Sequence, residues 1–377
     1  MGVPAVELKG ITKTFGSIVA NSDCSLTVEK GEILSVLGEN GSGKTTLMNM
    51  LAGIYFPDAG QIFVNGEEVV IRSPKDAFKY NIGMIHQHFK LVDVFTATEN
   101  IVLGMHDEEK FNLAEAEKKV RQITERYGFA VDLKKKIYEM SVSEKQTVEI
   151  IKVLYRGANI LILDEPTAVL TPQETRRLFD VLRRMREDGK SIIIITHKLY
   201  EVLSISDRVA ILRKGEYIGA VDTGTTNQDE LTEMMVGRPI VLEIERPEVE
   251  RGEKRLQVVD LTCQNGEGVT ALDNVSFDAY GGEILGIAGI AGSGQKELCE
   301  VIAGLYPAIG GAVLYSGEKN GVPVRENLLG MSPDVIVQKG VSMAFVPEDR
   351  LGMGLVASMD MTDNVMLRSY KSGKGIF

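Results

Sequence analysis

The sequence predicts an α/β fold, with helices packed on a sheet, that is present in two copies. Three observations support this prediction: a glycine-rich loop between a strand pattern and a helix pattern, further apolar strand patterns that end in polar residues, and an internal repeat. The chain has 377 residues, of which 44% are hydrophobic and 25% are charged. These values are ordinary for globular proteins, and about 150 residues per domain predicts two or three domains.

The repeat sets the domain organisation. Residues 31–66 and 282–317 align without a gap. Four pairs of glycines lie 251 residues apart: Gly31 and Gly282, Gly38 and Gly289, Gly53 and Gly304, Gly66 and Gly317. A spacing this long indicates a duplicated domain and is too long for a solenoid repeat. We therefore expect a complete domain at 1–240, a linker rich in charge and proline at 241–255, and the N-terminal portion of a second domain at 256–377.

A phosphate-binding loop is the first functional element. It fits G-x-x-x-x-G-K-[ST] at every specified position, follows the strand pattern Ile33–Leu37 and opens into a helix pattern with an apolar face. Glycines let backbone N–H groups surround an anion, Lys44 reaches the outer phosphates, and Thr45 offers a hydroxyl to Mg²⁺. A glycine-rich turn that binds nothing is the less favoured alternative. The residues assigned to nucleotide binding are Gly38, Glu39, Asn40, Gly41, Ser42, Gly43, Lys44, Thr45 and Thr46.

A helical segment is expected between the phosphate loop and the strand pattern that begins at Ile160. Apolar residues recur at helical spacing from Leu113 to Tyr127, and Gly128 marks the end of this helix. Most of the apolar face is expected to pack against the core. We place a helical subdomain at about 88–158.

Two further apolar runs end in residues that suit catalysis. Ile160–Leu163 is followed by Asp164 and Glu165, and Ser191–Thr196 is followed by His197. Asp164 is placed to bind Mg²⁺ through water, and Glu165 to polarise an attacking water as a general base. Adjacent acids can also be solvated loop charges, and a lone histidine is usually structural. Ligands of open α/β sheets, however, bind at the carboxyl ends of the strands.

Together these motifs resemble those of the ATP-binding-cassette (ABC) ATPases. In that family the phosphate-binding loop is called Walker A, here Gly38–Thr45, and the strand with the two acids is called Walker B, here Ile160–Glu165. A glutamine loop at Gln87 and a signature-like segment at 140–146 lie between them, as in that family. The resemblance implies a P-loop NTPase cassette with a mixed sheet and a helical subdomain, ATP as ligand and Mg²⁺ as cofactor. It also implies that Gln87 contacts Mg²⁺ and that His197 contacts the γ-phosphate. Phe15 would stack on adenine, although it also fits an ordinary apolar strand end.

The signature departs from the family's usual Leu-Ser-Gly-Gly-Gln, which holds the ATP of an opposing cassette. This chain keeps Ser141 but lacks glycine at the next two positions, which hinders close approach of the backbone. The resemblance assigns Ser141, Ser143 and Gln146 to the partner's ATP. After Walker B, Thr171 stands where the family often has aspartate, and it fits equally well as the N-cap of a helix that begins at Pro172.

The second copy has a degenerate phosphate loop. It keeps Gly289 and Gly294 but has Gln295 in place of the lysine and Lys296 in place of the hydroxyl residue. Loss of a cation about 4 Å from the phosphates weakens binding by about one to three decades. Glu348 replaces the glutamine of the first copy, so we expect a site that binds poorly or does not turn over. The later motifs of the first copy have no counterpart in the sequence, and we expect an unpaired surface to be exposed in the second copy.

Within the family, the chain resembles the tandem-cassette ATPases of bacterial importers of simple sugars and nucleosides. The intact first site, the degenerate second loop and the Val-Pro-Glu-Asp-Arg segment carry this resemblance. It implies membrane permease subunits, a second cassette and, indirectly, a solute-binding protein as partners. No apolar run approaches the ~20 residues that span a bilayer, so we expect a cytoplasmic chain held at the inner face of the cell membrane by the permease.

The alternative is a soluble twin-cassette ATPase that acts on ribosomes or DNA. A net charge of −11 argues against a nucleic-acid partner. The short linker and Gln295 also depart from that class, whose members typically have a long charged segment between the cassettes and keep the phosphate-loop lysine in both copies. In either class the first site needs a complete signature from a second cassette. We therefore expect this chain to bind MgATP and to hydrolyse it slowly by itself.

Overall fold

A computed structural model describes residues 2–87, 89–104, 113–238, 251–265, 268–290, 292–319, 321–341, 343–347 and 350–367. The chain divides into two compact units, Met1–Glu243 and Ile244–Phe377, and each is considered separately. The expected linker at 241–255 lies mostly outside the described residues. Its last two residues belong to the first strand of the second unit, which begins at Lys254, two residues before the expected start of the second domain.

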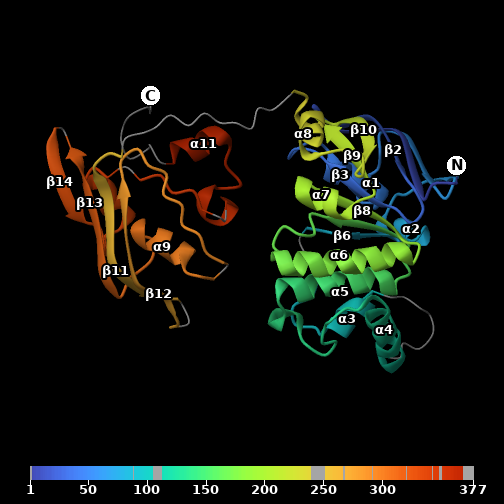
Figure 1. Ribbon diagram of the computed structural model, residues 1–377, viewed down its shortest axis with the longest axis horizontal. Helices are drawn as coiled ribbons and strands as arrows, with labels where there is room; N and C mark the ends of the chain where they lie inside the picture. The colour runs from blue at the N-terminus through green and yellow to red at the C-terminus, as the bar shows by residue number, and fades with distance from the viewer. Residues whose placement is uncertain are drawn as a thin grey trace. The chain divides into compact units, whose positions relative to one another are not determined.

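Two sheets form the framework of the first unit (Figure 1). One is antiparallel with the order β2-β1-β4-β5, and the other has the order β10-β9-β3-β8-β7-β6. In the second sheet β10 is antiparallel to β9 and the other pairings are parallel, so the expected mixed sheet is confirmed. The strands are β1 (Val6–Phe15), β2 (Ile18–Val28), β3 (Ile33–Leu37), β4 (Ala59–Val64), β5 (Glu67–Val69), β6 (Ile82–Ile85), β7 (Ile160–Asp164), β8 (Ser191–Thr196), β9 (Arg208–Arg213) and β10 (Glu216–Asp222).

Helices cover the mixed sheet and extend beyond it at one end. Figure 1 shows α3, α4 and α5 gathered at the end of the unit opposite β9 and β10, and these helices lie within the expected subdomain at 88–158. Gln146 and Val148 on α5 are buried, as is Val120 on α4. The helices are α1 (Lys44–Leu51), α2 (Pro74–Lys79), α3 (Ala97–Val102), α4 (Leu113–Tyr127), the 3-10 helix η1 (Ile137–Glu139), α5 (Val142–Tyr155), α6 (Pro172–Glu187), α7 (Leu199–Ile205) and α8 (Gln228–Val236).

The central strands read as continuous apolar runs because both faces of the sheet are covered. All residues of β3, β7 and β8 are buried. Alternate residues face two cores: Ile193 and Ile195 pack in the core beside the antiparallel sheet, whereas Ile192 and Ile194 pack with α6. This burial fixes the register of the strands, and with it the positions of the polar residues at their carboxyl ends.

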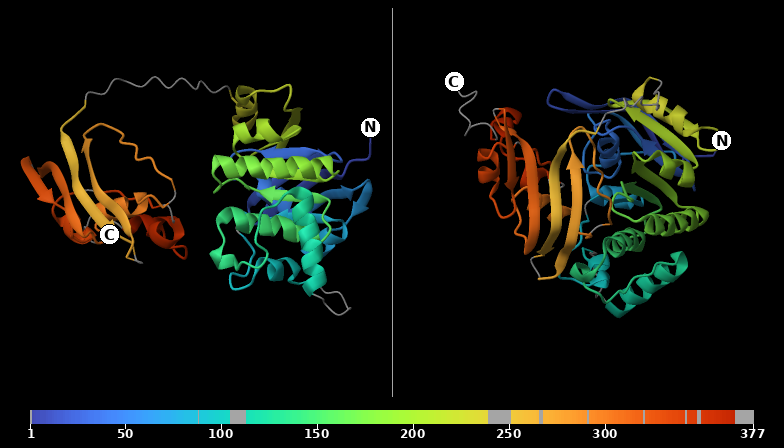
Figure 2. Two further views of the ribbon diagram at one scale, coloured as in Figure 1. Left: turned by 60° about the horizontal axis from the view of Figure 1, so that its bottom comes forward. Right: turned by 60° about the vertical axis from the view of Figure 1, so that its left-hand side comes forward.

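The second unit repeats the antiparallel sheet in the order β12-β11-β13-β14 (Figure 2). Helix α9 occupies the positions of α1 shifted by 251 residues, which supports a duplication. Residues 284–288, which align with β3, form no strand, and Ile284 is 100% exposed, as expected for an unpaired surface. The elements are β11 (Lys254–Gln264), β12 (Thr270–Tyr280), α9 (Gln295–Ile302), β13 (Gly310–Lys319), β14 (Val322–Asn327), α10 (Pro333–Gln338), the π-helix η2 (Arg350–Gly354) and α11 (Met361–Met366).

Candidate nucleotide-binding and hydrolysis site

Four neighbouring strands bring the expected site residues to one edge of the mixed sheet. The parallel strands β3, β8, β7 and β6 are consecutive in the sheet, so their carboxyl ends lie side by side. The phosphate loop follows β3, Asp164 ends β7, His197 follows β8, and Gln87 lies two residues after β6. Residues more than 100 positions apart in sequence thus share one site.

The phosphate loop depends on its glycines at two close approaches. Gly43 has a φ of 92°, and a Cβ atom there would lie 2.4 Å from the carbonyl oxygen of Ala20. A Cβ atom on Gly38 would lie 2.2 Å from the carbonyl oxygen of Leu212 and 2.5 Å from Ser42 Oγ. Side chains larger than hydrogen would therefore displace the loop from the sheet.

Lys44 lies beneath this loop, only 6% exposed. Its ammonium donates to the carbonyl oxygens of Gly38 and Glu39, at 2.8 Å each. Burial lowers the pKa of Lys44, while the nearby carboxylates oppose the shift. Ser42 Oγ is buried and has no hydrogen-bond partner among the described residues. A cation and a hydroxyl aimed into a glycine cradle suit a ligand with phosphate oxygens.

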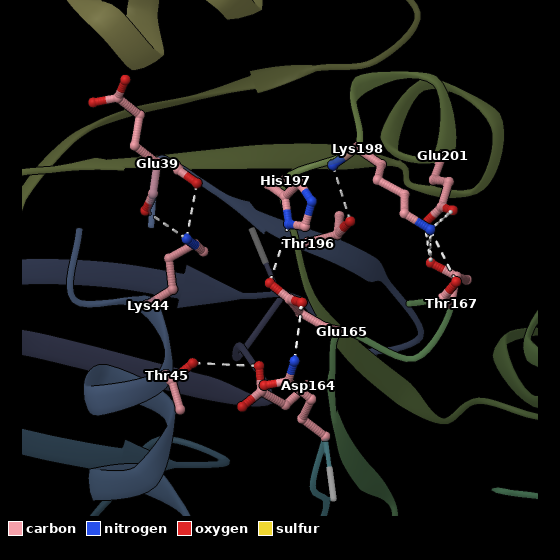
Figure 3. Close-up of polar contacts among 12 residues, drawn as sticks. Glu39, Lys44, Thr45, Asp164, Glu165, Thr167, Thr196, His197, Lys198 and Glu201 are labelled. Carbon is pink, nitrogen blue, oxygen red and sulfur yellow. Dashed lines mark hydrogen bonds and ion pairs between the residues drawn. The ribbon is translucent and has the colours of Figure 1, made fainter. Parts of the chain in front are cut away.

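The residues beside the loop fit a magnesium ion. Thr45 Oγ1 lies 3.3 Å from Asp164 Oδ1, so a hydroxyl and a carboxylate face the same space (Figure 3). Burial raises the pKa of Asp164, and the hydrogen bond from Thr45 opposes this shift. Oxygen atoms of this kind, completed by phosphate and water, are the ligands that Mg²⁺ prefers. Gln87, the third expected ligand, donates its side-chain amide to Glu165, the residue after Asp164.

The carboxylate of Glu165 is held from two sides. His197 Nδ1 lies 3.1 Å from Glu165 Oε1 (Figure 3). Gln87 Nε2 donates to Glu165 Oε2 over 3.3 Å. The three residues expected to be catalytic therefore lie in direct contact. Contacts to both of its oxygens fix the direction of this carboxylate, as a general base requires.

The remaining nucleotide-binding candidates are Phe15, Glu39, Asn40, Gly41 and Thr46. Phe15, at the end of β1, is 42% exposed, and its ring meets Tyr55 edge to face with centroids 5.1 Å apart. An exposed ring braced in this way offers a face to a base. Glu39 and Asn40 are exposed, and Glu39 contributes its backbone carbonyl to Lys44. The structure gives Gly41, like Gly43, a positive φ, and it places Thr46 half-buried in α1.

The signature-like segment lies at the start of α5, and its candidate residues differ in exposure. Ser141 is an exposed N-cap that accepts from the backbone N–H of Glu144, and Ser143 is half-buried in the first turn. Gln146 differs, because it is 5% exposed and its amide donates 2.6 Å to the carbonyl oxygen of Pro166. Its side chain faces the interior of this unit. We therefore remove Gln146 from the residues expected to reach a partner's ATP.

Thr171, the other departure from the family pattern, is the N-cap of α6 in a capping box with Glu174, as the sequence predicts. Glu144, by contrast, was not predicted to have a role. Its carboxylate accepts from the backbone N–H of Ser141, and Lys135 Nζ lies 2.9 Å from both of its oxygens. The signal was available in the sequence, since Glu144 completes the S-x-x-E capping box of Ser141.

The second phosphate loop keeps the backbone shape but not the contacts. Gly294 has a φ of 89°, yet Gln295 only donates 3.0 Å to the carbonyl oxygen of Ile287, and Gly289 is exposed. The exposed Lys296 lies 3.9 Å from the buried Glu300 in an i, i+4 pair. Glu348, the replacement for the glutamine, lies outside the described residues.

Comparisons with known proteins identify the family. A family model for ABC transporters matches residues 21–168. A nucleoside import ATP-binding protein of Lactococcus lactis is 41% identical over 97% of this chain and 71% of its own length. The chain belongs to the ABC transporter ATPases. This ABC ATPase is also 42% identical to a guanosine import ATP-binding protein of Bacillus subtilis over 97% of the chain and 70% of that protein, and 39% identical to a glucose import ATP-binding protein of Haloferax volcanii over 98% and 71%.

Solved structures support the fold of this ABC ATPase. The ADP conformation of an ATP-binding cassette of an ABC transporter matches with a TM-score of 0.55 at 24% identity, over 62% of this chain and all but 1% of that one. A nucleotide-free ATP-binding cassette from an ABC transporter matches with a TM-score of 0.54 at 24% identity, over 65% of this chain and all of that one. The ABC ATPase is an ATP hydrolase and the ATP-binding subunit of an importer. Within the described residues, no helix combines the length and apolarity needed to cross a bilayer.

Proposed function

We propose that the site at the carboxyl edge of the mixed sheet binds MgATP and hydrolyses it to drive import of a nucleoside or a simple sugar through a membrane permease. The observation that carries the proposal is the cluster of Lys44, Thr45, Asp164, Glu165 and His197 at one edge. The chemistry of these five side chains matches each requirement of phosphoryl transfer to water.

Each side chain has a defined task in this proposal. Lys44 and the backbone N–H groups of the loop hold the outer phosphates. Thr45 and Asp164 hold the metal, and Mg²⁺ when bound neutralises negative charge on the phosphates. Glu165 orients the attacking water and takes its proton, and His197 holds Glu165 in position while its ring faces the γ-phosphate. Phe15 stacks on the adenine.

The partners follow from the same proposal. Ser141 at the start of α5 contacts ATP held by a second cassette, and the permease lies against the helical subdomain and holds the chain at the inner face of the membrane. A solute-binding protein delivers the solute to that permease. The names of the relatives include nucleoside, guanosine and glucose importers, which support either solute class. The net charge of −11 continues to disfavour the alternative of action on ribosomes or DNA.

Two measurements test this function. First, release of phosphate from MgATP is compared between the parent chain, Lys44→Ala and Lys79→Ala, a control lysine whose side chain is 72% exposed. We expect slow turnover that is lost in Lys44→Ala and kept in Lys79→Ala. Second, the chain is reconstituted with its permease and binding protein in vesicles, and uptake of labelled nucleosides and sugars is measured. Uptake of neither class in a coupled, ATP-hydrolysing system would overturn the assignment of solute.

A further inference from the structure

The turn after β7 is held by more contacts than a surface turn requires. Glu165 has a φ of 47°, in the left-handed region that residues other than glycine seldom adopt. Its backbone N–H donates 2.9 Å to the carbonyl oxygen of Ile195 in β8, and the next carbonyl, that of Pro166, accepts from Gln146. A strained backbone persists only where its surroundings impose it, so the contacts around this turn set the direction of the Glu165 side chain.

Thr167, within this turn, takes part in a partly buried ionic network (Figure 3). Lys198 Nζ donates to the carbonyl oxygen of Thr167 at 2.9 Å and to its hydroxyl at 3.2 Å, and it lies 3.1 Å from Glu201 Oε1. The Thr167 hydroxyl in turn donates to the other oxygen of Glu201. Thr167 is 2% exposed and Glu201 9% exposed, so the contact between them forms away from bulk water, whereas the Lys198 side chain is 37% exposed. Hydrogen bonds to charged groups are stronger and more directional under such conditions.

The network joins the two segments that carry the catalytic pair. Thr167 lies two residues after Glu165, and Lys198 directly follows His197 and is the N-cap of α7. The backbone N–H of Lys198 also donates to Thr196 Oγ1, which anchors the start of this segment to the end of β8. Two connections therefore join these segments: the 3.1 Å contact between His197 Nδ1 and Glu165 Oε1, and the charged contacts of Lys198 with Thr167 and Glu201.

We propose that Lys198, Thr167 and Glu201 form a latch that holds the turn after β7 against the loop after β8, and thereby positions Glu165 and His197 for hydrolysis. The three are positioning residues, since they contact neither the phosphate loop nor the carboxylate of Glu165 among the described contacts. This inference rests on the proposed roles of Glu165 and His197. Displacement of a reacting group by about 1 Å can cost ~100-fold in rate.

The test separates positioning from folding with matched substitutions in the full chain. Thr167→Val removes the hydroxyl at constant shape, and Thr167→Ser restores it. Thr98→Val is the control, because Thr98 lies in α3 of the helical subdomain, is 4% exposed, and donates its hydroxyl 3.0 Å to the carbonyl oxygen of Leu133, which is not a site residue. We expect kcat of Thr167→Val to fall by about 10–100-fold with the Kd for ATP within about twofold, and kcat of Thr167→Ser and Thr98→Val to stay within about threefold.

The lysine of the latch has its own control. Lys190 also binds a backbone carbonyl and a side-chain oxygen, at 2.9 and 3.0 Å, but it precedes β8 and lies at the opposite edge of the sheet. Lys198→Met should lower kcat as Thr167→Val does, whereas Lys190→Met should leave kcat unchanged. Equal losses in both lysine variants would overturn the latch, because they would indicate a general loss of stability.

A readout independent of turnover completes the test. The chain has four histidines, so ring-labelled histidine gives few NMR signals, and His197→Gln identifies one of them. We expect that signal to shift in Thr167→Val and Lys198→Met and not in their controls. An unshifted signal with parental kcat would overturn the latch. If Lys44→Ala keeps full turnover, the proposed function fails instead, and the NMR comparison still decides whether the network positions His197.

Discussion

The two phosphate loops share a backbone but differ in what their side chains contact. In both, the second and third glycines have positive φ, at 81° and 92° in the first loop and 82° and 89° in the second. In the first loop the lysine is buried against two carbonyl oxygens, whereas Gln295 at the same position makes one bond to Ile287. Ser42 is buried without a partner among the described residues, while Ser293 is exposed and donates to the carbonyl oxygen of Ile290.

The comparison shows that a loop conformation alone is not a nucleotide site. The strand before the first loop is buried between β8 and β9. Asp164 ends β7, on the other side of β8, and Glu165 follows it. The aligned residues before the second loop form no strand in the described part of that unit. Function therefore depends on the parallel sheet as much as on the glycines, and four predictions test this difference.

The largest effect is expected from Glu165→Gln. If hydrolysis occurs only in the first unit, loss of the general base should lower kcat of the chain by about 10²–10⁴-fold. The Kd for ATP should change little, because the carboxylate contacts Gln87 and His197 and not the phosphate loop. Phosphate release and nucleotide titration measure the two quantities. Residual turnover above a tenth of the parent's would assign hydrolysis to another site.

The second loop provides the next test, through Gln295→Lys. Restoring the cation alone should leave the stoichiometry at one nucleotide per chain in calorimetric titration, because Lys296 still replaces the hydroxyl and the preceding segment is unpaired. A gain of a second site with a Kd within tenfold of the first would mean that the side chain alone distinguishes the loops.

Stability should separate the two units next. Ile33 in β3 is 0% exposed, and its counterpart Ile284 is 100% exposed. Ile33→Ala should lower the free energy of unfolding by about 2–5 kcal/mol, and Ile284→Ala should change it by less than about 0.5 kcal/mol. Urea unfolding followed by circular dichroism measures both. Similar losses in the two variants would show that Ile284 is covered in solution.

The smallest effect concerns a contact that only the first unit has. Hydrogen bonds from Lys13 and Thr14 lower the pKa of Asp58 to about 2. A lowered pKa stabilises the folded state above the unfolded-state value of about 3.9, and this contribution is lost as the pH falls through about 2. Asp58→Asn should therefore lower the melting temperature at pH 7, and the difference should shrink below pH 4. A difference that is constant down to pH 2 would contradict this. Ile309 stands at the equivalent position of the second unit.

Local rules predicted a large part of the fold and of the candidate site. The strands β3 and β8 have the bounds that their apolar runs indicate, and the helix that begins at Pro172 has the expected capping box. The phosphate loop was readable because its spacing and its strand and helix context are short-range features. The strand ends of an open sheet then predicted that Asp164 and His197 would lie at the same edge.

Other features depend on contacts that no local pattern encodes. Gln146 faces inward because the packing of α5 on the turn after β7 decides which side of the helix is buried. The position of Gln146 in the signature-like segment does not indicate which side that is. The contacts of Lys198 with Thr167 and Glu201 depend on β7 and β8 being neighbours. From sequence, Lys198 is only a charged residue before a helix.

The position of β3 between β8 and β9 also has a consequence for how the chain folds during synthesis. The antiparallel sheets pair segments that are close in sequence, whereas β3 must wait for partners that begin at Ser191, more than 150 residues later. At about 5–20 residues per second, the ribosome takes roughly 8–30 s to produce them. During that interval one of the most apolar segments of the chain, Ile33–Leu37, has no native strand to pair with. We expect the nascent chain to need a chaperone at this stage, before it can bind any nucleotide.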